Sequence, residues 1–193
     1  AASARRRSDS SRAFRVSAGA FFQVNTRMAE AMVQHILETL PRYTTLSANS
    51  VLIDCYCGVG LFSAFLAPQV GRLIGIEASS SACEDFVENL DEFDHVELYE
   101  APVEVALPQL DARPDAILLD PPRGGLDRGA SDAVLSLAAP LLVYISCDPA
   151  TLARDAKRLT AGSYRLEQIT PFDMFPQTYH IESISFWILE ERN

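Results

Sequence analysis

The sequence predicts one α/β domain built around a mostly parallel β-sheet. From residue 14 onward, short apolar runs alternate with amphipathic segments, which is the pattern of consecutive βαβ units. The chain has 193 residues, of which 48% are hydrophobic, and this is enough for one sizeable core. Acidic or thiol side chains stand at or directly after the ends of several apolar runs. Because these positions form the ligand-binding edge of a parallel sheet, the pattern that predicts the fold also predicts a site.

The elements follow in order. The first is a helix over residues 26–40, with Asn25 or Thr26 available as N-cap and Pro41 after its end. Strands and helices then alternate. We expect strands at residues 51–55, 72–77, 96–99, 116–120 and 141–146. We expect helices near residues 61–67, 79–90, 103–110, 131–138 and 149–160.

The last part of the chain departs from this alternation. Residues 164–170 and 181–189 are strand-like and are joined by a loop rich in proline and aromatic residues, without a helix. Such a connection favours an antiparallel, hairpin-like finish to the sheet. At the other end, residues 1–13 are rich in Ser, Ala and Arg, which is typical of a flexible leader. We therefore assign residues 14–193 to the domain.

Composition and charge exclude several classes of protein. A net charge of −10 argues against strong, unaided binding of a polyanion, because phosphate contacts dominate nucleic-acid affinity. No apolar run approaches the roughly 20 residues of a membrane span, and no signal-peptide core is present, so we expect a cytoplasmic protein without a membrane partner. We also expect a monomer. The cysteines form no C-x-x-C pair and have no histidines at zinc spacing, so we expect reduced thiols and no metal. They are Cys55, Cys57, Cys83 and Cys147.

Cys147 occupies the most informative position of the chain. It follows the apolar run 141–145 and Ser146, and it precedes a helix that starts near Pro149. Amide groups at a helix start and a nearby arginine lower the pKa of a thiol, which makes a cysteine here a candidate nucleophile. A buried structural cysteine is the alternative interpretation of the position alone.

A second motif is D-C-Y-C-G-V-G at residues 54–60, where a strand runs into a glycine turn and then a helix. Gly58 and Gly60 let the backbone approach a ligand closely. The motif lacks the third glycine of a dinucleotide fingerprint and the lysine of a P-loop, so it suits a nucleoside with little or no phosphate. The next strand ends at Glu77, whose carboxylate can accept hydrogen bonds from both hydroxyls of a ribose. S-adenosylmethionine and a dinucleotide both fit this pattern, and an ordinary βα turn with a solvated acid is the alternative.

Two more motifs complete the set. D-P-P-R-G-G at residues 120–125 follows the fourth strand, and its prolines stiffen the loop and hold Asp120 at the strand end. D-M-F-P-Q-T-Y-H-I-E at residues 173–182 opens the last strand and places Glu182 beside aromatic and apolar residues. Because such surroundings raise the pKa of a carboxyl group, Glu182 suits a general base or acid.

Together these motifs resemble those of the RNA uridine-C5 methyltransferase family, whose members make 5-methyluridine in tRNA and large-subunit rRNA. The resemblance includes F-F-Q-V-N at residues 21–25 and Y-I-S-C-D-P-A-T-L-A-R-D at residues 144–155, and it covers nearly everything after the leader. It implies the C-terminal catalytic domain of that family. The implied fold is a Rossmann-like S-adenosylmethionine-dependent methyltransferase: a mostly parallel seven-stranded sheet with an antiparallel last strand and helices on both faces.

The resemblance also implies roles for single residues. Cys147 would be the nucleophile that adds to uracil C6, and Glu182 would be the base that removes the C5 proton. Arg123 or a backbone amide would stabilise negative charge at the C4 oxygen. S-adenosylmethionine would be the cofactor and RNA, either rRNA or tRNA, the partner. The cofactor would contact Gln23, Tyr56, Gly58, Gly60, Glu77 and Asp120.

The chain departs from the family's pattern at four positions. Asp148 replaces the asparagine that commonly follows S-C, and Gln177 replaces a histidine. Leu61 follows the glycine turn where asparagine is frequent, and Pro102 stands where a polar adenine contact is expected. The last two departures leave open a module that binds S-adenosylmethionine without turnover. An amine-directed methyltransferase is a third possibility, which the arginine after the prolines and the strand-end thiol disfavour.

Full-length members of the family contain an N-terminal oligonucleotide-binding barrel and a central RNA-contacting domain, and some hold an iron–sulfur cluster. None of these is present in this sequence. We therefore expect a catalytic fragment without an iron–sulfur cluster, which binds RNA only weakly by itself.

Overall fold

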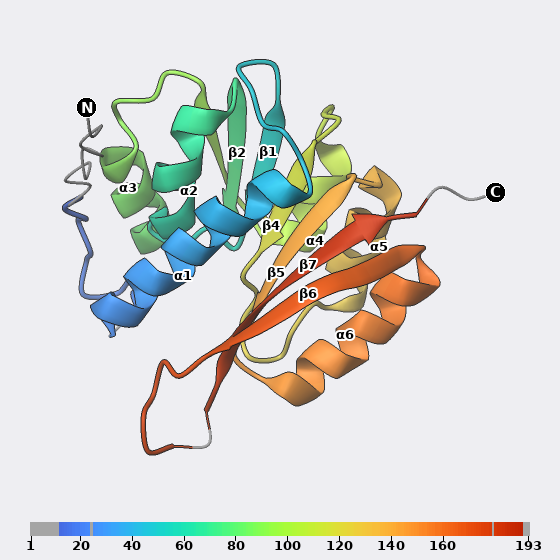
Figure 1. The fold of residues 1–193 in the computed structure, drawn as a ribbon. Helices are drawn as coiled ribbons and strands as arrows, with labels where there is room; N and C mark the ends of the chain where they lie inside the picture. The colour runs from blue at the N-terminus through green and yellow to red at the C-terminus, as the bar shows by residue number, and fades with distance from the viewer. Residues whose placement is uncertain (1–11, 24, 179, 191–193) are drawn as a thin grey trace, which may run out of the picture.

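A seven-stranded sheet forms the centre of the molecule, in the order β3-β2-β1-β4-β5-β7-β6 (Figure 1). The computed structural model describes residues 12–23, 25–178 and 180–190. Every pairing from β3 to β5 is parallel, whereas β7 runs antiparallel to both β5 and β6. The predicted sheet with an antiparallel last strand is therefore confirmed. The strands are β1 (Val51–Cys55), β2 (Arg72–Glu77), β3 (Val96–Glu100), β4 (Ala116–Leu119), β5 (Leu141–Ser146), β6 (Tyr164–Phe172) and β7 (Glu182–Leu189).

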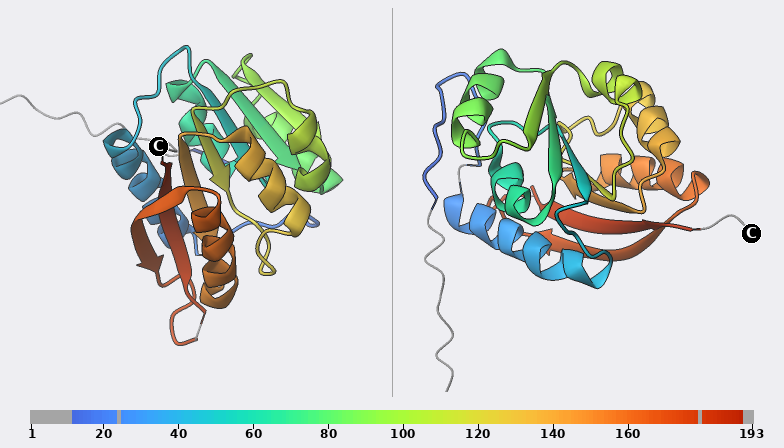
Figure 2. Two further views of the ribbon diagram at one scale, coloured as in Figure 1. Left: turned by 90° about the vertical axis from the view of Figure 1, so that its right-hand side faces the viewer. Right: turned by 90° about the horizontal axis from the view of Figure 1, so that it is seen from above.

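Helices cover both faces of the sheet (Figure 2). Buried side chains of α1, α2 and α3 pack in a core on one face, and those of α4, α5 and α6 pack in a second core on the other face. The α-helices are α1 (Thr26–Thr39), α2 (Leu61–Leu66), α3 (Ser80–Asn89), α4 (Val103–Ala106), α5 (Arg128–Leu137) and α6 (Pro149–Ala161). The short 3-10 turns of the described residues are η1 (Leu40–Arg42), η2 (Ala67–Gln69) and η3 (Leu107–Gln109). Among the described residues, none of the helices has the length and apolar character that crossing a membrane requires.

Capping residues explain where the helices begin. Asn25 accepts a hydrogen bond from the Met28 amide and so caps α1, as predicted. Asp127 caps α5 in the same way, and for this reason α5 begins at Arg128 rather than at the predicted residue 131. The predicted helix 103–110 divides into α4 and η3, because Pro108 at the start of η3 lacks an amide donor.

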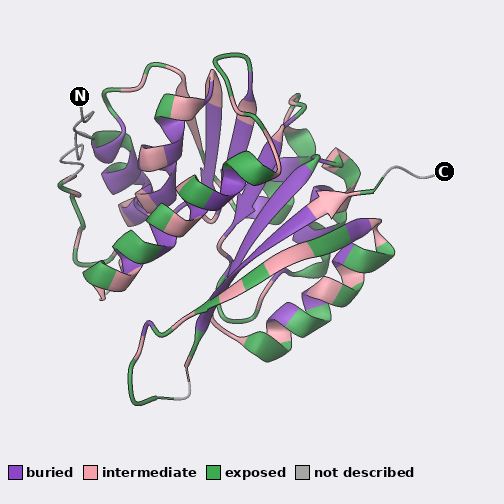
Figure 3. Ribbon diagram, in the orientation of Figure 1, coloured by how far each residue is buried: buried purple, intermediate pink, exposed green. Residues whose placement is uncertain are grey.

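The side-chain alternation of the strands places the polar strand-end residues on one face. Leu52, Leu73, Leu118, Ile145 and Ile184 all point into the core that α1, α2 and α3 cover. Successive side chains of a strand alternate between faces, so positions two residues further towards the same edge share that face. Those positions include Asp54, Asp120, Cys147 and, on the antiparallel β7, Glu182. On β2 they are Gly75 and, two residues further, Glu77. Figure 3 shows that the central strands leading to this edge are largely buried.

The segment before α1 runs along α3 and reaches the same edge (Figure 1). The buried Asp85 of α3 accepts hydrogen bonds from the amide and the hydroxyl of Ser17. Asn89 of α3 bonds the backbone of Arg15 in both directions and also donates to the Val59 carbonyl in the glycine turn. These contacts fix the course of residues 15–23 towards the site.

Candidate active site

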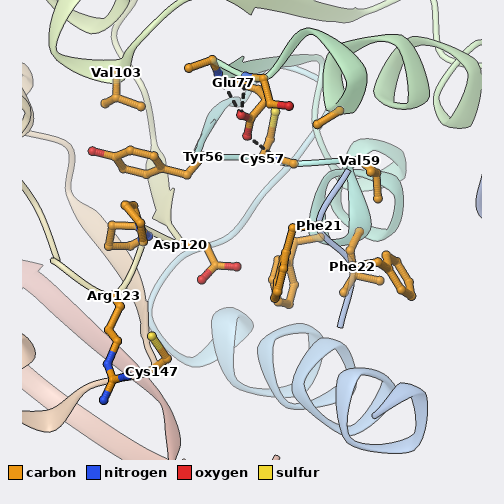
Figure 4. Close-up of a pocket in the computed structure, with 18 of the residues that line it drawn as sticks. Phe21, Phe22, Tyr56, Cys57, Val59, Glu77, Val103, Asp120, Arg123 and Cys147 are labelled. Carbon is orange, nitrogen blue, oxygen red and sulfur yellow. Dashed lines mark hydrogen bonds between the residues drawn. The ribbon is translucent and has the colours of Figure 1, made fainter. Parts of the chain in front are cut away.

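A cavity of about 820 Å³ opens at the carboxyl ends of the parallel strands (Figure 4). Most of the site residues expected from the sequence line it. They are Gln23, Tyr56, Gly58, Glu77, Asp120, Arg123, Cys147 and Glu182. Gly60 is the exception: it does not line the cavity and is the N-cap residue of α2, with φ of +89°. The structure therefore brings residues of the five separate motifs, together with Glu77, into one site.

Glu77 lies at one end of the cavity and organises the glycine turn (Figure 4). Its Oε2 accepts a 2.9 Å hydrogen bond from the Gly58 amide, and its Oε1 accepts 2.8 Å bonds from the amides of Ala78 and Ser79. A carboxylate has about four lone-pair sites, so these bonds orient the group and leave it able to accept from a ligand. Gly58 has φ of +54°, and a Cβ built on it would meet nothing within 4 Å. This end of the cavity therefore offers a fixed acceptor beside open, side-chain-free backbone.

Apolar side chains form the wall next to this end. The ring of Tyr56 lies below Val103 in Figure 4, and both line the cavity. Leu61 and Pro102, two of the departures from the family's pattern, also line it. The polar contacts that the family often makes at these two positions are thus replaced by apolar surface.

The opposite end of the cavity holds Cys147 and Glu182. Ser183 at the start of β7 pairs with Ser146 at the end of β5, so Glu182 and Cys147 come next on neighbouring strands. Glu182 is 6% exposed, and Cys147 is half-buried. Asp120 lies between this end and the glycine turn, with its carboxylate directed into the cavity (Figure 4).

Asp148 connects the start of α6 to the loop after β4. Its Oδ1 accepts hydrogen bonds from the amides of Ala150 (2.8 Å) and Thr151 (3.1 Å), and its Oδ2 lies 3.5 Å from Arg123 Nε. These interactions, first the backbone hydrogen bonds and then Arg123, hold the pKa of Asp148 below its usual value. Asp148 therefore caps the helix, as an asparagine would, and adds an ion pair with Arg123 beside the thiol.

The electrostatics of this end differ from the sequence-based expectation. The pKa of the Cys147 thiol is raised, mainly by burial and then by the charges of Glu182 and Asp120, while Arg123 acts in the opposite direction. The prediction that the helix start and an arginine lower this pKa is therefore wrong, because burial, together with two carboxyl groups on adjacent strands, outweighs them. Burial also raises the pKa of Glu182, which confirms the expectation for that residue. The pKa of Asp120 is raised well above its ordinary value by burial and by neighbouring carboxylates.

Two buried acids near the site were not recognised from the sequence as candidate residues. Asp54 on β1 accepts a hydrogen bond from Ser63, and Asp155 on α6 is fully buried. A signal for Asp155 was present, since it shares the helical spacing of the buried Leu152 and Leu159. Within the described parts of the chain, the four cysteines are free, and no group of three or more His, Cys, Asp or Glu residues could hold a metal ion.

Comparison with known proteins agrees with this arrangement. The sequence model of the tRNA (uracil-5-)-methyltransferase family matches residues 5–101 and 104–190. An uncharacterized RNA methyltransferase of Thermosynechococcus vestitus is 41% identical over 175 residues, which cover 89% of this chain and 38% of that protein. One of Enterococcus faecalis is 38% identical over 177 residues, with the same shares of the two chains. The chain thus spans about two fifths of the length of these relatives.

Solved structures give the same result. The Pyrococcus abyssi tRNA (uracil-54, C5)-methyltransferase in complex with S-adenosyl-L-homocysteine superposes with a TM-score of 0.73 and 29% identity, over 88% of this chain and 40% of that one. The N-methyltransferase NodS of Bradyrhizobium japonicum superposes with a TM-score of 0.69 at 17% identity, over 86% of this chain and 99% of that one, a likeness of fold alone. The chain has the Rossmann-like fold of S-adenosylmethionine-dependent methyltransferases. With its strand-end motifs gathered around one cavity and the family match along nearly its whole length, it belongs to the tRNA (uracil-5-)-methyltransferase family.

Proposed function

We propose that this chain is the catalytic domain of an enzyme that methylates C5 of a uridine in RNA, with S-adenosylmethionine as methyl donor and Cys147 as covalent nucleophile. The observation that supports this most directly is the pair of Cys147 and Glu182 on neighbouring strands at one end of a cavity whose other end is the glycine turn and Glu77. One cavity therefore has room for a nucleoside-bearing donor beside a nucleophile and a base.

The residues at the glycine turn fit S-adenosylmethionine. Glu77 retains acceptor capacity for ribose hydroxyls, and the open space at Gly58 admits a ligand close to the backbone. Tyr56 and Val103 provide apolar surface for a flat base, and Gln23 and Asp120 provide polar groups along the cavity. When bound, the donor supplies a methyl group activated by its sulfonium.

The reacting end fits addition to a pyrimidine ring. Uracil C5 is a weak nucleophile until the Cys147 thiolate forms a bond with C6, which moves the C5–C6 π electrons towards the C4 oxygen. Arg123 lies beside this thiol and favours its ionised form. The same cation is placed to stabilise the negative charge that develops on the ring.

Glu182 then completes the reaction. Attack of C5 on the sulfonium methyl would break the S–CH3 bond and release neutral S-adenosylhomocysteine, so that C5 would bear both the new methyl group and its original proton. The Glu182 carboxylate removes that proton. The electrons of that C–H bond re-form the C5–C6 double bond and expel the Cys147 thiolate, which leaves 5-methyluridine. The raised pKa of Glu182 makes its carboxylate a stronger base than an exposed one.

The partner is proposed to be RNA, either tRNA or rRNA, and the protein is expected to be cytoplasmic and monomeric. With a net charge of −10, this chain should bind RNA weakly. Regions outside this sequence would then supply most of the affinity for RNA. The relatives have room for such regions, since this chain matches only 38% of their length.

Intact-protein mass spectrometry with a uridine-containing RNA and S-adenosylmethionine tests the proposal. In a Glu182→Gln variant we expect a covalent species with the mass of the protein, the RNA and one methyl group, and we expect neither this species nor product in Cys147→Ala. Methylated RNA without any such species in a Glu182→Gln variant would contradict the covalent route and favour direct transfer to an amine. Calorimetric binding of S-adenosylhomocysteine with neither adduct nor product, in the presence of the regions that bind RNA, would favour a module without turnover.

A further inference from the structure

Arg154 and Asp155, on the second turn of α6, hold the loop that follows β4. Asp155 is 0% exposed, and its Oδ2 accepts 2.8 Å hydrogen bonds from the Leu126 amide and from the Tyr144 hydroxyl on β5. Arg154 bonds Asp155 Oδ1 through Nε at 2.9 Å. Its terminal nitrogen donates to the carbonyls of Gly124 (2.8 Å) and Leu126 (3.1 Å). One ion pair therefore joins α6, β5 and the loop at residues 120–127.

The loop is shaped to lie directly on this pair. Gly125 has φ of +71°, and its amide donates a 2.7 Å hydrogen bond to the Pro122 carbonyl. A Cβ on Gly125 would lie 2.4 Å from Asp155 Oδ2 and 2.6 Å from the terminal nitrogen of Arg154. A glycine is therefore needed where the loop meets the ion pair, both for its backbone conformation and for the close approach.

The same loop places Arg123. The guanidinium of Arg123 lies 3.5 Å from Asp148 and beside Cys147 at the reacting end of the cavity (Figure 4). Three carboxyl groups also face or flank this thiol: Glu182 from β7, Asp120 from the end of β4, and Asp148 next to it in the chain. Since Arg123 is the cation among these groups that favours the thiolate, its position decides how much of that effect Cys147 receives.

We propose that Arg154 and Asp155 are positioning residues, which fix the loop at residues 120–127 so that the Arg123 guanidinium stays beside the Cys147 thiol. The proposal rests on the proposed function only in taking Cys147 as the nucleophile. The loss of Arg154 would leave the buried Asp155 carboxylate without its ion pair and would remove the donor that ties the Gly124 and Leu126 carbonyls to α6, so the loop would move. Neither Arg154 nor Asp155 lines the cavity, so both would act on the site only through the loop.

The test is the pH dependence of Cys147 alkylation by iodoacetamide, read as modification of its peptide by mass spectrometry. The other three cysteines are buried, so their peptides report whether each variant stays folded. Arg123→Ala should move the midpoint of the Cys147 profile upwards by roughly 0.5–1 pH unit. Arg154→Ala should move it in the same direction. The double variant should move it no further than the larger single change, because both act through Arg123.

Arg165→Ala is the matched control. Arg165 lies on β6 and pairs with Glu167 and Glu190 at the surface, so its removal should leave the profile unchanged. Arg154→Lys should shift the midpoint less than Arg154→Ala does. Lysine keeps the positive charge beside Asp155 but cannot make the several hydrogen bonds of the guanidinium. A folded Arg154→Ala protein with the wild-type profile, or additive shifts in the double variant, would overturn the proposal.

Asp155→Asn keeps the test decisive if Arg154→Ala does not fold. Asparagine can still accept from the Leu126 amide and the Tyr144 hydroxyl but loses the ion pair with Arg154, so a smaller shift in the same direction is expected, and an unchanged profile would contradict the proposal. The alkylation assay needs neither RNA nor cofactor. Shifted alkylation profiles in the variants, together with no methylation by the wild-type protein in the presence of the regions that bind RNA, would therefore reject the proposed function and retain the positioning role.

Discussion

The Ser63 hydroxyl donates a 2.5 Å hydrogen bond to Asp54 Oδ2 beneath the glycine turn, and both side chains are buried. Asp54 Oδ1 has no hydrogen-bond partner among the described residues. Burial raises the pKa of Asp54 to about 7, although the hydrogen bond from Ser63 opposes the shift. The folded state is therefore more stable when this carboxyl group holds a proton, because burial of its charged form outweighs the hydrogen bond from Ser63.

Asp54→Asn should reduce the pH dependence of stability. The folded state binds this proton up to about pH 7, whereas the unfolded state releases it near pH 3.8. The stability that protonated Asp54 contributes to the wild type is therefore fully present below pH 3.8. It is lost as the pH rises to about 7. Asparagine cannot ionise, so the variant should not lose this stability as the pH rises. The free energy of unfolding of the variant minus that of the wild type should increase by on the order of 2–4 kcal/mol from pH 4 to pH 8. Urea unfolding at several pH values measures this, and parallel profiles for the two proteins would contradict it.

Glu77→Ala should weaken the binding of S-adenosylhomocysteine by about 1–3 kcal/mol, because acceptors for the ribose are lost. The loss of the bonds to Gly58, Ala78 and Ser79 should add to the effect by loosening the turn. Isothermal calorimetry reads the affinity. Glu97→Gln is the control, since Glu97 pairs with Arg72 on the surface and does not line the cavity. Equal affinities of the Glu77 variant and the wild type would remove Glu77 from the cofactor site.

Alanine at Gly58 and at Gly60 should produce different defects. At Gly58 the new methyl group enters the open cavity, so the protein should fold, with a backbone cost of roughly 1–2 kcal/mol, and lose cofactor binding. At Gly60 it would lie 2.4 Å from Leu90 Cδ1 and 3.0 Å from Phe86, so the larger defect should be in stability. Thermal melting and calorimetry separate the two, and a Gly58→Ala protein with unchanged affinity would disagree with the proposed cofactor position.

Cys147→Ala and Glu182→Gln should stop the reaction at different points. Without the thiolate, neither adduct nor product should form, because C5 is not activated. With Glu182→Gln the addition and the methyl transfer should proceed, and a protein–RNA species with the new methyl group should accumulate, since the amide cannot remove the C5 proton. Denaturing electrophoresis with a labelled methyl donor records both outcomes. Release of product by Glu182→Gln at the wild-type rate would assign the base to another residue.

The methylation rate should rise with pH through and above the ordinary thiol range. The pKa of Cys147 is raised, so the thiol is half ionised only at a pH above the usual value for cysteine, about 8.5. A pH series of initial adduct formation, at saturating RNA, measures this. A rate that is already at its plateau at pH 6 would show that bound RNA or cofactor lowers the pKa of the thiol substantially.

The sequence was sufficient for features that depend on local pattern. The strand-end positions of Glu77, Asp120 and Cys147 followed from short apolar runs, and the alternation of side chains placed them on one face. The sequence did not predict the direction of the Cys147 pKa shift. That direction depends first on burial of the thiol and then on Glu182, which is remote in sequence and is brought near by the antiparallel pairing of β7. The contacts of Asp155 with the loop after β4 likewise join segments whose relation only the packing of α6 determines.

The pairing of β7 with β5 makes the site sensitive to changes in strand register but less sensitive to changes in the segment between β6 and β7. The spacing of Cys147 and Glu182 is set by a ladder that runs from Leu141↔Ile188 to Ser146↔Ser183, and not by the segment that joins β6 to β7. A slip of one residue in that ladder would turn Glu182 to the opposite face of the sheet. Met174 in the joining segment is buried, and its carbonyl accepts a hydrogen bond from Asn25, but residues 176–178 are exposed and can change without altering the ladder. The joining segment projects past the sheet in Figure 1. Under the proposed function, substitutions at this exposed tip would change the contacts with RNA and leave the pair of reacting side chains in place.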